Sequence, residues 1–394
     1  MAEKYDFDEI IDRRGTDSVK WDLAQDPEVL PMWVADMDFR TAPEITEALI
    51  NKVSGGLFGY GSIPENFYES IIGWWRDVHH FTVRREWILA GPGMIPTLSA
   101  IVRTFLKPGE SMIIQPPVYN HFFTVIENCG MHLVKNNLIF ENGDYKIDFE
   151  DLETKAADPG TKLLLLCNPH NPVGKAWQKK ELEKIAEICS RHEVMVVSDE
   201  IHADLVLKGH QHHPFVGAAE GYALRHITCG SPCKTFNLAS LPIAYSISPD
   251  LQVLERIRKT LEMQETAYPN PLAAEALIAA YTNGRAWLEE LKDYLAGNFE
   301  YLQQFCTEYL PEVLVIPLQA TYLVWLDCSA LNEDSAGLTK ILLDEEKLWL
   351  NPGTMYGESG EGFIRINIAC PRELLSWGLS RLRNYRNRKV AAGS

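Results

Sequence analysis

The sequence predicts an α/β protein of two domains, in which a large domain with a mostly parallel sheet is followed by a smaller α+β domain. Two patterns support this prediction. From about residue 87 to 282, short β-like runs alternate with amphipathic stretches typical of helices. After Pro269, a long tract of helix formers with a 3.6-residue period leads into strand-like runs and a last helix. A chain of 394 residues is also too long for one ordinary domain.

The large domain is predicted from its apolar runs and from the amphipathic stretches 95–106 and 179–193 between them. Strands are expected at residues 87–90, 111–115, 132–136, 162–167, 194–199, 226–230 and 244–248. The run 162–167 is mostly leucine, which fits a central strand buried on both faces. Ligands of such sheets bind at the carboxyl ends of the strands. The residues that follow each run are therefore the candidates for a site.

The helical tract after Pro269 is broken at Asn283-Gly284. Strands are then expected at 313–317, 322–327 and 362–369, and a final amphipathic helix from about residue 372. We predict a division into an N-terminal segment, 1–45, that joins the small domain, a large cofactor-binding domain, 46–282, and a small C-terminal domain, 283–394.

Composition excludes several classes of function. The net charge of −17, from 54 acidic and 37 basic residues, argues against binding to nucleic acid or to an anionic membrane surface. No apolar run approaches the ~20 residues of a membrane span, and the charged N-terminus lacks the apolar core of a signal peptide. Eight cysteines without a CxxC pair are typical of reduced, buried thiols. We expect a soluble, cytoplasmic protein.

Two strand ends carry weak signals for a ligand. In "AGPGMIPTLSAIV" (90–102), a Gly-Pro-Gly turn opens a helix, so the backbone amides of Gly93, Met94 and Ile95 would face an anion such as phosphate. A Gly/Pro turn that only links the strand to the helix, without a ligand, explains the same residues. In "QPPVYNHF" (115–122), Tyr119 lies just beyond a strand, where it would either stack on a flat ring or simply pack.

Two further strand ends carry polar side chains. "LCNPHNPVGKAW" (166–177) places Asn171 in a rigid loop as a donor to a phenolate-type oxygen, or as part of an Asx-turn. In "VMVVSDEIHADL" (194–205), Asp199 ends a buried strand and needs a cationic partner, and His202 would share its site. A metal held with the histidines of "GHQHHP" is the rival interpretation. Solvated loop histidines are favoured, because no helical i, i+4 pair is present, and no metal is predicted.

The stretch "HITCGSPCKTFNLASLP" (226–242) puts Ser231 and Lys234 at the same sheet edge as Asp199. A desolvated lysine at such a place can act as a nucleophile. In "GFIRINIA" (362–369), Arg365 is suited to a bidentate grip on a carboxylate, or to an interdomain salt bridge.

One ligand matches this set, namely pyridoxal 5′-phosphate (PLP) carrying an amino acid. Its phosphate would lie at the helix start and Ser231, and its ring would stack on Tyr119. Asn171 would meet the ring oxygen, Asp199 the pyridinium nitrogen and Lys234 the aldehyde. Arg365 would hold the carboxylate of the substrate.

With these residues in place, the chain resembles the fold-type I PLP-dependent enzymes over essentially its full length. More narrowly, it is similar to the MalY/PatB-type cystathionine β-lyases, the C–S β-lyase branch. The motifs that carry the resemblance are "RRGTDSVKWD" (13–22), "PMWVADMDF" (31–39), "FGYG" (58–61), "PPVYNHF", "NPHNPVG", "SDEIHADL", "SPCKTFN" and "FIRINIACPR".

The resemblance implies the fold-type I transferase fold and a catalytic Lys234 that binds PLP covalently. It also implies that Asn171 and His202 flank the ring oxygen and that Ala35 lines the substrate pocket through its backbone. Tyr60 would reach the phosphate in the neighbouring subunit, which implies a homodimer. Members similar to this branch can also bind a transcription factor, so a regulatory protein partner is a further expectation.

The chain departs from the family pattern just after the lysine. Ser240 stands where the family usually has glycine, and Pro242 lies where many aminotransferases have a phosphate-binding arginine. Cys233 is interpreted as a packing residue. The residues alone serve both a lyase and an aminotransferase. The resemblance favours the lyase, with cystathionine or a related cysteine S-conjugate, an amino-acid thioether, as substrate.

Overall fold

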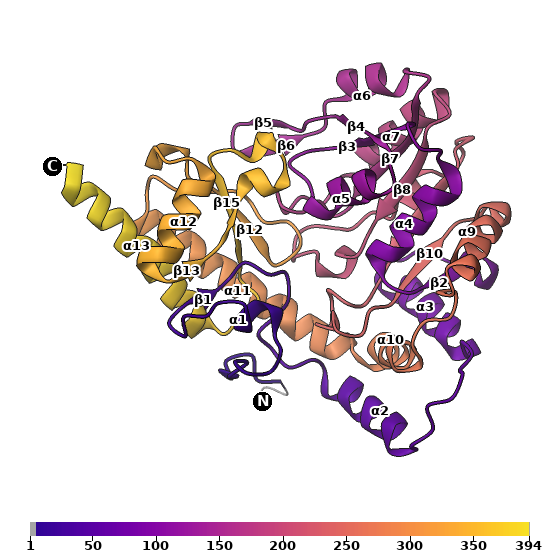
Figure 1. Ribbon diagram of the computed structural model, residues 1–394, viewed down its shortest axis with the longest axis horizontal. Coiled ribbons are helices and arrows are strands. Elements are labelled where there is room, and N and C mark those ends of the chain that lie inside the picture. The colour runs from indigo at the N-terminus through magenta and orange to yellow at the C-terminus, as the bar shows by residue number, and fades with distance from the viewer. Residues whose placement is uncertain (1–4, 394) are drawn as a thin grey trace.

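The computed structural model describes residues 5–393. Its large domain is built on a seven-stranded sheet, and its small domain on a four-stranded antiparallel sheet (Figure 1). The large sheet has the order β2-β10-β9-β8-β7-β3-β4, in which β10 is antiparallel to both neighbours and the other pairings are parallel. The predicted mostly parallel sheet is therefore confirmed. Its strands are Ile88–Gly91 (β2), Ser111–Ile114 (β3), His132–Lys135 (β4), Thr161–Cys167 (β7), Met195–Asp199 (β8), His226–Gly230 (β9) and Ala244–Ile247 (β10).

Both faces of the large sheet are buried, because successive side chains of its central strands point to opposite faces. Leu163 and Leu165 of β7 belong to one apolar core, and Leu164 and Leu166 belong to another. The first core contains helices Met94–Phe105 (α4), Asn120–Asn128 (α5) and Leu251–Met263 (α9). The opposite face is covered by Phe149–Ala156 (α6), Lys179–Arg191 (α7) and Phe215–Ala218 (α8), and beside β2 and β10 by Glu65–Val78 (α3) and Pro271–Asn283 (α10). The leucine run is thus the doubly buried central strand that the sequence predicts.

Local sequence explains where the main helices begin and end. Helix α7 starts with a capping box between Gln178 and Glu181. Helix α10 starts with Pro271 in its first turn and with Asn270 capping the amide of Leu272. It ends at Asn283, and Gly284 separates it from the long helix Arg285–Tyr309 (α11), as the sequence predicts.

A side chain at Gly284 has no room. Its Cβ would lie 2.4 Å from the ring of Phe236, which follows Lys234 by two residues. The glycine therefore lets the α10–α11 junction pack directly against the loop that carries the candidate lysine.

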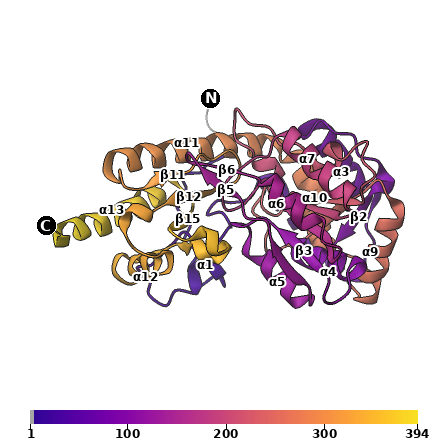
Figure 2. The ribbon, with the colours of Figure 1, turned by 90° about the horizontal axis from the view of Figure 1, so that it is seen from above.

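The small domain combines α11 with the strands Leu314–Val315 (β11), Leu323–Asp327 (β12), Phe363–Asn367 (β15) and Asn351–Pro352 (β14), in the order β11-β12-β15-β14. Figure 2 shows α11 lying along these strands. The domain also contains Ser335–Glu346 (α12) and Arg372–Gly393 (α13), which begins where the sequence predicts the last helix.

The N-terminal segment contacts both domains. Leu30–Pro31 (β1) pairs in parallel with Leu348–Trp349 (β13) of the small domain. The next helix, Pro43–Ser54 (α2), packs against α10 of the large domain. The short helix Val19–Asp22 (α1) and the hairpin of Ile139–Glu141 (β5) and Asp144–Lys146 (β6) complete the elements.

The cysteines and the helices bear on two expectations drawn from composition. All eight cysteines are free and buried. Among the helices of residues 5–393, none combines the length and the apolar character needed to cross a bilayer.

Candidate active site

A pocket at the carboxyl ends of the large-sheet strands brings most of the predicted residues together. Its lining comes from the N-terminal segment, from the start of α4, from the residue before α5, and from the ends of β7, β8 and β9 with the loops that follow them. The lining residues are Ala35, Met94, Ile95, Tyr119, Cys167, Asn171, Asp199, Ile201, His202 and Lys234. Residues from six separate stretches of the chain therefore converge on one pocket.

Lys234 lies in the turn after β9, and its amine points at the N-terminal segment. Its Nζ donates a hydrogen bond to the carbonyl oxygen of Ala35 at 2.5 Å. Burial lowers the pKa of this amine, and the positive charge of Arg365 lowers it further. A lowered pKa enlarges the unprotonated share of the amine at any given pH, and the unprotonated form is the one that can attack a carbonyl carbon or accept a proton.

Asp199 is a buried carboxyl without a matching cation. Its Oδ1 accepts a hydrogen bond from the amide of Ile201 at 3.2 Å, and no basic side chain of residues 5–393 forms a salt bridge with it within 4.0 Å. Burial raises its pKa to about 7, although Lys234 opposes the rise. A carboxyl in this state has room for a cationic hydrogen-bond donor at its other oxygen.

The start of α4 is the place where an anion-binding turn is predicted. Gly93 precedes the helix with a φ of 135°, which is unfavourable for a residue with a side chain. A Cβ at this position would also lie 3.1 Å from the Cβ of Pro242. The proline that departs from the aminotransferase pattern therefore packs against this turn, while Ser240 is exposed. The first amides of α4 have no intrahelical acceptor and are available to an anion.

Tyr119 and His202 line the pocket on different elements. Burial raises the pKa of the Tyr119 hydroxyl, and the charge of Asp199 raises it further, so the ring is neutral. Burial lowers the pKa of His202 to about 3, with Lys234 and Arg365 adding to the effect. Within the described part of the chain, Nδ1 of His202 has no hydrogen-bond partner. A neutral imidazole can serve a ligand oxygen as a hydrogen-bond donor.

Arg365 fixes the orientation of Asn171. Nη1 of Arg365 donates to Oδ1 of Asn171 at 3.1 Å, and its Nη2 donates to the carbonyl oxygen of Trp33 at 2.8 Å. Because the amide oxygen of Asn171 is occupied by the guanidinium, its NH₂ group is the part left to donate to a ligand. The Nε of Arg365 is buried and has no partner among the described residues. The arginine therefore keeps a donor for a substrate carboxylate.

Ser231 and Cys233 have internal partners. The Ser231 hydroxyl donates to the carbonyl oxygen of Ile243 at 2.6 Å and accepts from the amide of Cys233 at 3.1 Å. A contact of Ser231 with a phosphate would require this hydroxyl to turn, and it stays a prediction. The Cys233 thiol is buried, 3.6 Å from the carbonyl oxygens of Leu241 and Ile243, a packed environment.

Tyr60 is fully exposed in the connection between α2 and α3 and does not line the pocket of its own chain. Leu57 and Phe58 beside it are also exposed. The predicted contribution of Tyr60 to a neighbouring subunit stays a prediction.

The histidines of "GHQHHP" do not gather around a metal. His212 Nε2 lies 2.7 Å from the carboxylate of Glu200, the residue after Asp199. Ser198 and the amide of Phe215 donate to the same carboxylate. Across residues 5–393, no group of three or more acidic, histidine or cysteine side chains is arranged to hold a metal ion. His212 instead helps to fix the residue next to Asp199.

Sequence reasoning missed several residues of the site. Cys167 and Ile201 line the pocket, and Tyr322 donates to the carbonyl oxygen of Ala35 at 3.0 Å. Cys167 is the last residue of the predicted strand 162–167, so the carboxyl-end rule could have found it. Nothing in the strand-like run around Tyr322 indicates a contact with residue 35.

A larger groove, of about 790 Å³, lies elsewhere, between the N-terminal segment, α2 and the start of α11. Among residues 5–393, Arg40 is the one cation that lines it, and it is paired with Glu9. The groove contains none of the predicted site residues. The chemistry therefore belongs to the smaller pocket.

The residues of that pocket fit PLP. An unpaired buried carboxyl is present for a protonated pyridine nitrogen, and the NH₂ of Asn171 would be available to donate to a ring oxygen. The start of α4 suits a phosphate, and Lys234 suits an aldehyde. This donor set satisfies the polar groups of the cofactor without requiring a new charged residue.

Comparison with known proteins agrees with this chemistry. Residues 27–382 match the model of the aminotransferase class I and II family. Cystathionine beta-lyase PatB of Bacillus subtilis is 42% identical, with 96% of this chain and 98% of PatB covered. Protein MalY of Escherichia coli is 37% identical, with 96% and 98% covered. The PLP-bound C–S lyase of Staphylococcus hominis superposes with a TM-score of 0.91 at 32% identity, over 97% of this chain and 98% of that one. The chain belongs to the aminotransferase class I and II family.

Proposed function

We propose that this member of the aminotransferase class I and II family is a PLP-dependent C–S β-lyase. It acts on cystathionine or a related cysteine S-conjugate and releases a thiol, pyruvate and ammonia. The observation that carries the proposal is the unpaired buried Asp199 in one pocket with Lys234, whose amine has a lowered pKa. The near full-length similarity to PatB, a cystathionine β-lyase, supports the choice of reaction.

The cofactor, when bound, draws electrons away from the Cα atom of an amino acid attached to it. Asp199 would hold the ring nitrogen, Asn171 the ring oxygen and Tyr119 one ring face. The amides at the start of α4 would hold the phosphate, and Lys234 would bind the aldehyde covalently.

Lys234 has two tasks in this reaction. It would hold the cofactor until a substrate amine takes its place, and its freed amine would then accept the proton from Cα. The lowered pKa keeps the amine available for both. Arg365, which retains a buried donor, grips the substrate carboxylate and turns the Cα–H bond towards Lys234. Loss of the thiolate from Cβ completes the elimination.

The anion-binding turn favours a lyase over an aminotransferase. Pro242 packs against Gly93 at the place where many aminotransferases carry an arginine. Turnover of cystathionine decides between the two reactions. A lyase forms pyruvate and a thiol without any added keto acid, whereas strict dependence on a keto-acid acceptor would overturn the proposal in favour of an aminotransferase.

A homodimer with shared sites is the second part of the proposal. Exposed apolar side chains at Leu57, Phe58 and Tyr60 support it, because such a cluster is costly to leave in water. Mixing inactive Tyr60→Ala and Lys234→Ala chains under conditions that exchange subunits tests it. Reassortment should restore about a quarter of the wild-type activity if Tyr60 serves the partner, since half of the dimers then hold one intact site. No recovery would assign Tyr60 to its own chain or to neither.

A regulatory protein partner remains part of the expectation from the resemblance. Lys234→Ala protein would keep such a surface while losing catalysis. Capture of a transcription factor by both the wild type and this variant would therefore support a role separate from catalysis.

A further inference from the structure

The segment Trp33–Phe39, called the strap below, passes between the two domains and over the pocket. Side chains of both domains bind its backbone carbonyl oxygens. The donors are Arg365 and Asn351 to Trp33, Asn367 to Val34 and Asp36, Lys234 and Tyr322 to Ala35, and Asn237 and Arg13 to Met37. The strap forms no helix or strand, so these side chains set its path.

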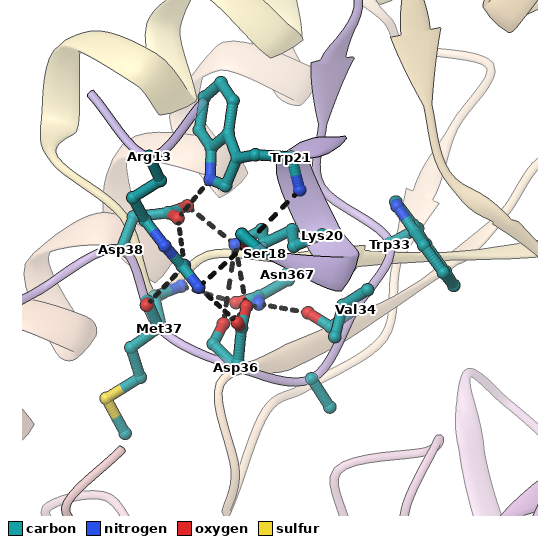
Figure 3. A network of polar contacts seen from close by, with 12 residues as sticks. Arg13, Ser18, Lys20, Trp21, Trp33, Val34, Asp36, Met37, Asp38 and Asn367 are labelled. Atoms are coloured by element: carbon teal, nitrogen blue, oxygen red, sulfur yellow. Dashed lines mark hydrogen bonds and ion pairs between the residues drawn. The ribbon is translucent and has the colours of Figure 1, made fainter. Parts of the chain in front are cut away.

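Ion pairs hold the acidic side chains of the strap (Figure 3). Lys20, which is 1% exposed, lies 2.6 Å from the carboxylate of Asp38. Arg13 pairs with Asp36 at 2.7 Å and with Asp38 at 2.8 Å. The two cations balance the two carboxylates, so the strap is anchored without a net charge beside the pocket.

Asn367 binds the strap on both sides of Ala35, the residue whose carbonyl accepts from Lys234. Its Nδ2 donates to the carbonyl oxygens of Val34 and Asp36 at 2.6 Å each, and these residues flank Ala35. Its Oδ1 accepts from the amide of Ala369, so the amide is fixed in this orientation. The Ala35 carbonyl between the two bonds is the acceptor of the Lys234 amine.

We propose that Asn367 is a positioning residue for Lys234. By holding the peptide groups on either side of Ala35, it aims the Ala35 carbonyl at the lysine amine and so sets where the freed amine stands. This inference rests on the proposed function in one respect, namely that Lys234 acts as the base. The hydrogen-bond geometry itself belongs to the chain alone.

A fixed carbonyl acceptor has two effects on a lysine. It orients the amine, and it favours the ammonium form over the neutral form, because an ammonium group is the stronger donor. Loss of the two Asn367 bonds frees the Ala35 carbonyl to turn away. The amine then loses its place and titrates at a lower pH. A misplacement of about 1 Å is enough to cost on the order of 100-fold in rate.

Asn367→Ala tests the proposal without changing the charge of the protein. Asn298→Ala is a matched control, because Asn298 is also buried. Its Nδ2 donates to two carbonyl oxygens, those of Ile368 and Cys370, at 2.8 and 2.9 Å. Its bonds do not touch the strap. Asn298→Ala also removes the acceptor of the Arg372 Nε, 2.6 Å from Oδ1, so it is the more disruptive of the two changes. A shift seen only in Asn367→Ala therefore reports position and not general loss of stability.

The first measurement needs no turnover. The rate at which cofactor-free protein takes up PLP, followed by the visible absorbance of the lysine-bound cofactor, depends on pH through the neutral amine of Lys234. We expect the apparent pKa of this pH–rate profile to be lower in Asn367→Ala than in the wild type. In Asn298→Ala the apparent pKa should equal that of the wild type. Equal profiles for all three proteins, or equal shifts in both variants, would overturn the proposal.

The second measurement uses the loaded enzyme and cystathionine. We expect kcat of Asn367→Ala to fall about 10- to 100-fold while KM changes by less than about threefold, because Arg365 still binds the carboxylate. A wild type that makes no pyruvate would refute the proposed lyase. The uptake profile would then still decide the role of Asn367, so the two failures are distinguishable.

If Asn367→Ala does not fold, Tyr322→Phe tests whether the Ala35 carbonyl is the acceptor that places Lys234. This change removes the second donor to the Ala35 carbonyl and leaves that oxygen to Lys234 alone. The apparent pKa of the PLP-uptake rate should then be higher than in the wild type. An equal or lower apparent pKa would overturn the assignment of Ala35 as the acceptor that places the lysine.

Discussion

Replacing Asp199 by asparagine should stabilise the cofactor-free protein at pH 8 while removing nearly all activity. Burial raises the pKa of Asp199 from its ordinary value of 3.8 to about 7. Each step of one in pKa corresponds to about 1.4 kcal/mol, so the ionised carboxylate costs the folded, cofactor-free chain on the order of 4 kcal/mol. Asparagine keeps an oxygen for the amide of Ile201 and carries no charge to bury.

The sign of the pH dependence follows from the raised pKa. Below about pH 4, the carboxyl is protonated in both the folded and the unfolded chain and contributes nothing. Between about pH 4 and 7, only the unfolded chain ionises, so the folded state loses stability as the pH rises. Above about pH 7, the full cost is present. The stability advantage of Asp199→Asn should therefore grow from near zero at about pH 3 to on the order of 2–4 kcal/mol at pH 8.

Urea unfolding of the cofactor-free proteins at several pH values measures this difference directly. Asp204→Asn serves as the control, because Asp204 is equally buried but accepts hydrogen bonds from Trp74, His79 and Thr235. Burial alone would raise its pKa, and these partners, His79 first, lower it instead. Removing this carboxylate should destabilise the protein at pH 8. The destabilisation should shrink in acid.

The reasoning is refuted if Asp199→Asn is less stable than the wild type at pH 8, or if its advantage does not depend on pH. Addition of PLP provides a second check. The cofactor supplies the missing cation, so it should stabilise the wild type more than Asp199→Asn. Equal stabilisation of both proteins would show that Asp199 does not pair with the ring nitrogen of PLP.

The other predictions concern individual side chains. Lys234→Ala should abolish the visible absorbance of the lysine-bound cofactor, and a band that survives dialysis would contradict the assignment. Arg365→Met should raise KM for cystathionine about 100-fold or more, measured by steady-state kinetics, because the substrate carboxylate loses its charge-assisted partner. A KM within about twofold of the wild type would show that another group holds the carboxylate. Cys233→Ala should keep kcat within about twofold and lower stability by about 1–2 kcal/mol in urea unfolding, as a packed thiol would, and a large loss of kcat would point to a chemical role.

The parts of the site that lie at strand ends could be predicted from the sequence. The carboxyl ends of neighbouring parallel strands meet at one edge of a sheet. Asn171 after β7, Asp199 at the end of β8 and Lys234 after β9 therefore had to converge once the strands were recognised. Each of these side chains also has a chemical type that limits what it can do there.

The strap could not be predicted in the same way. Its contribution comes from backbone carbonyls, which every residue possesses, so Ala35 carries no local signal of its contact with Lys234. Asn367 and Tyr322 lie in or next to strands whose pattern is explained by core packing alone. Ser231 shows the opposite case. A hydroxyl at a strand end suggests a phosphate contact, and this contact stays a prediction, because the hydroxyl bonds here to the backbone of Ile243.

The strap also constrains when during synthesis the protein can become an enzyme. Ala35 and Lys234 are 199 residues apart, and Val34 and Asn367 are 333 apart. The amine therefore finds its carbonyl only after the large domain has emerged from the ribosome, and that carbonyl is held only once β15 has been made. Chains that stop before Asn367 contain the lysine but lack the group that places it. A nascent chain that has not yet reached β15 therefore lacks the side chain that we propose orders the lysine.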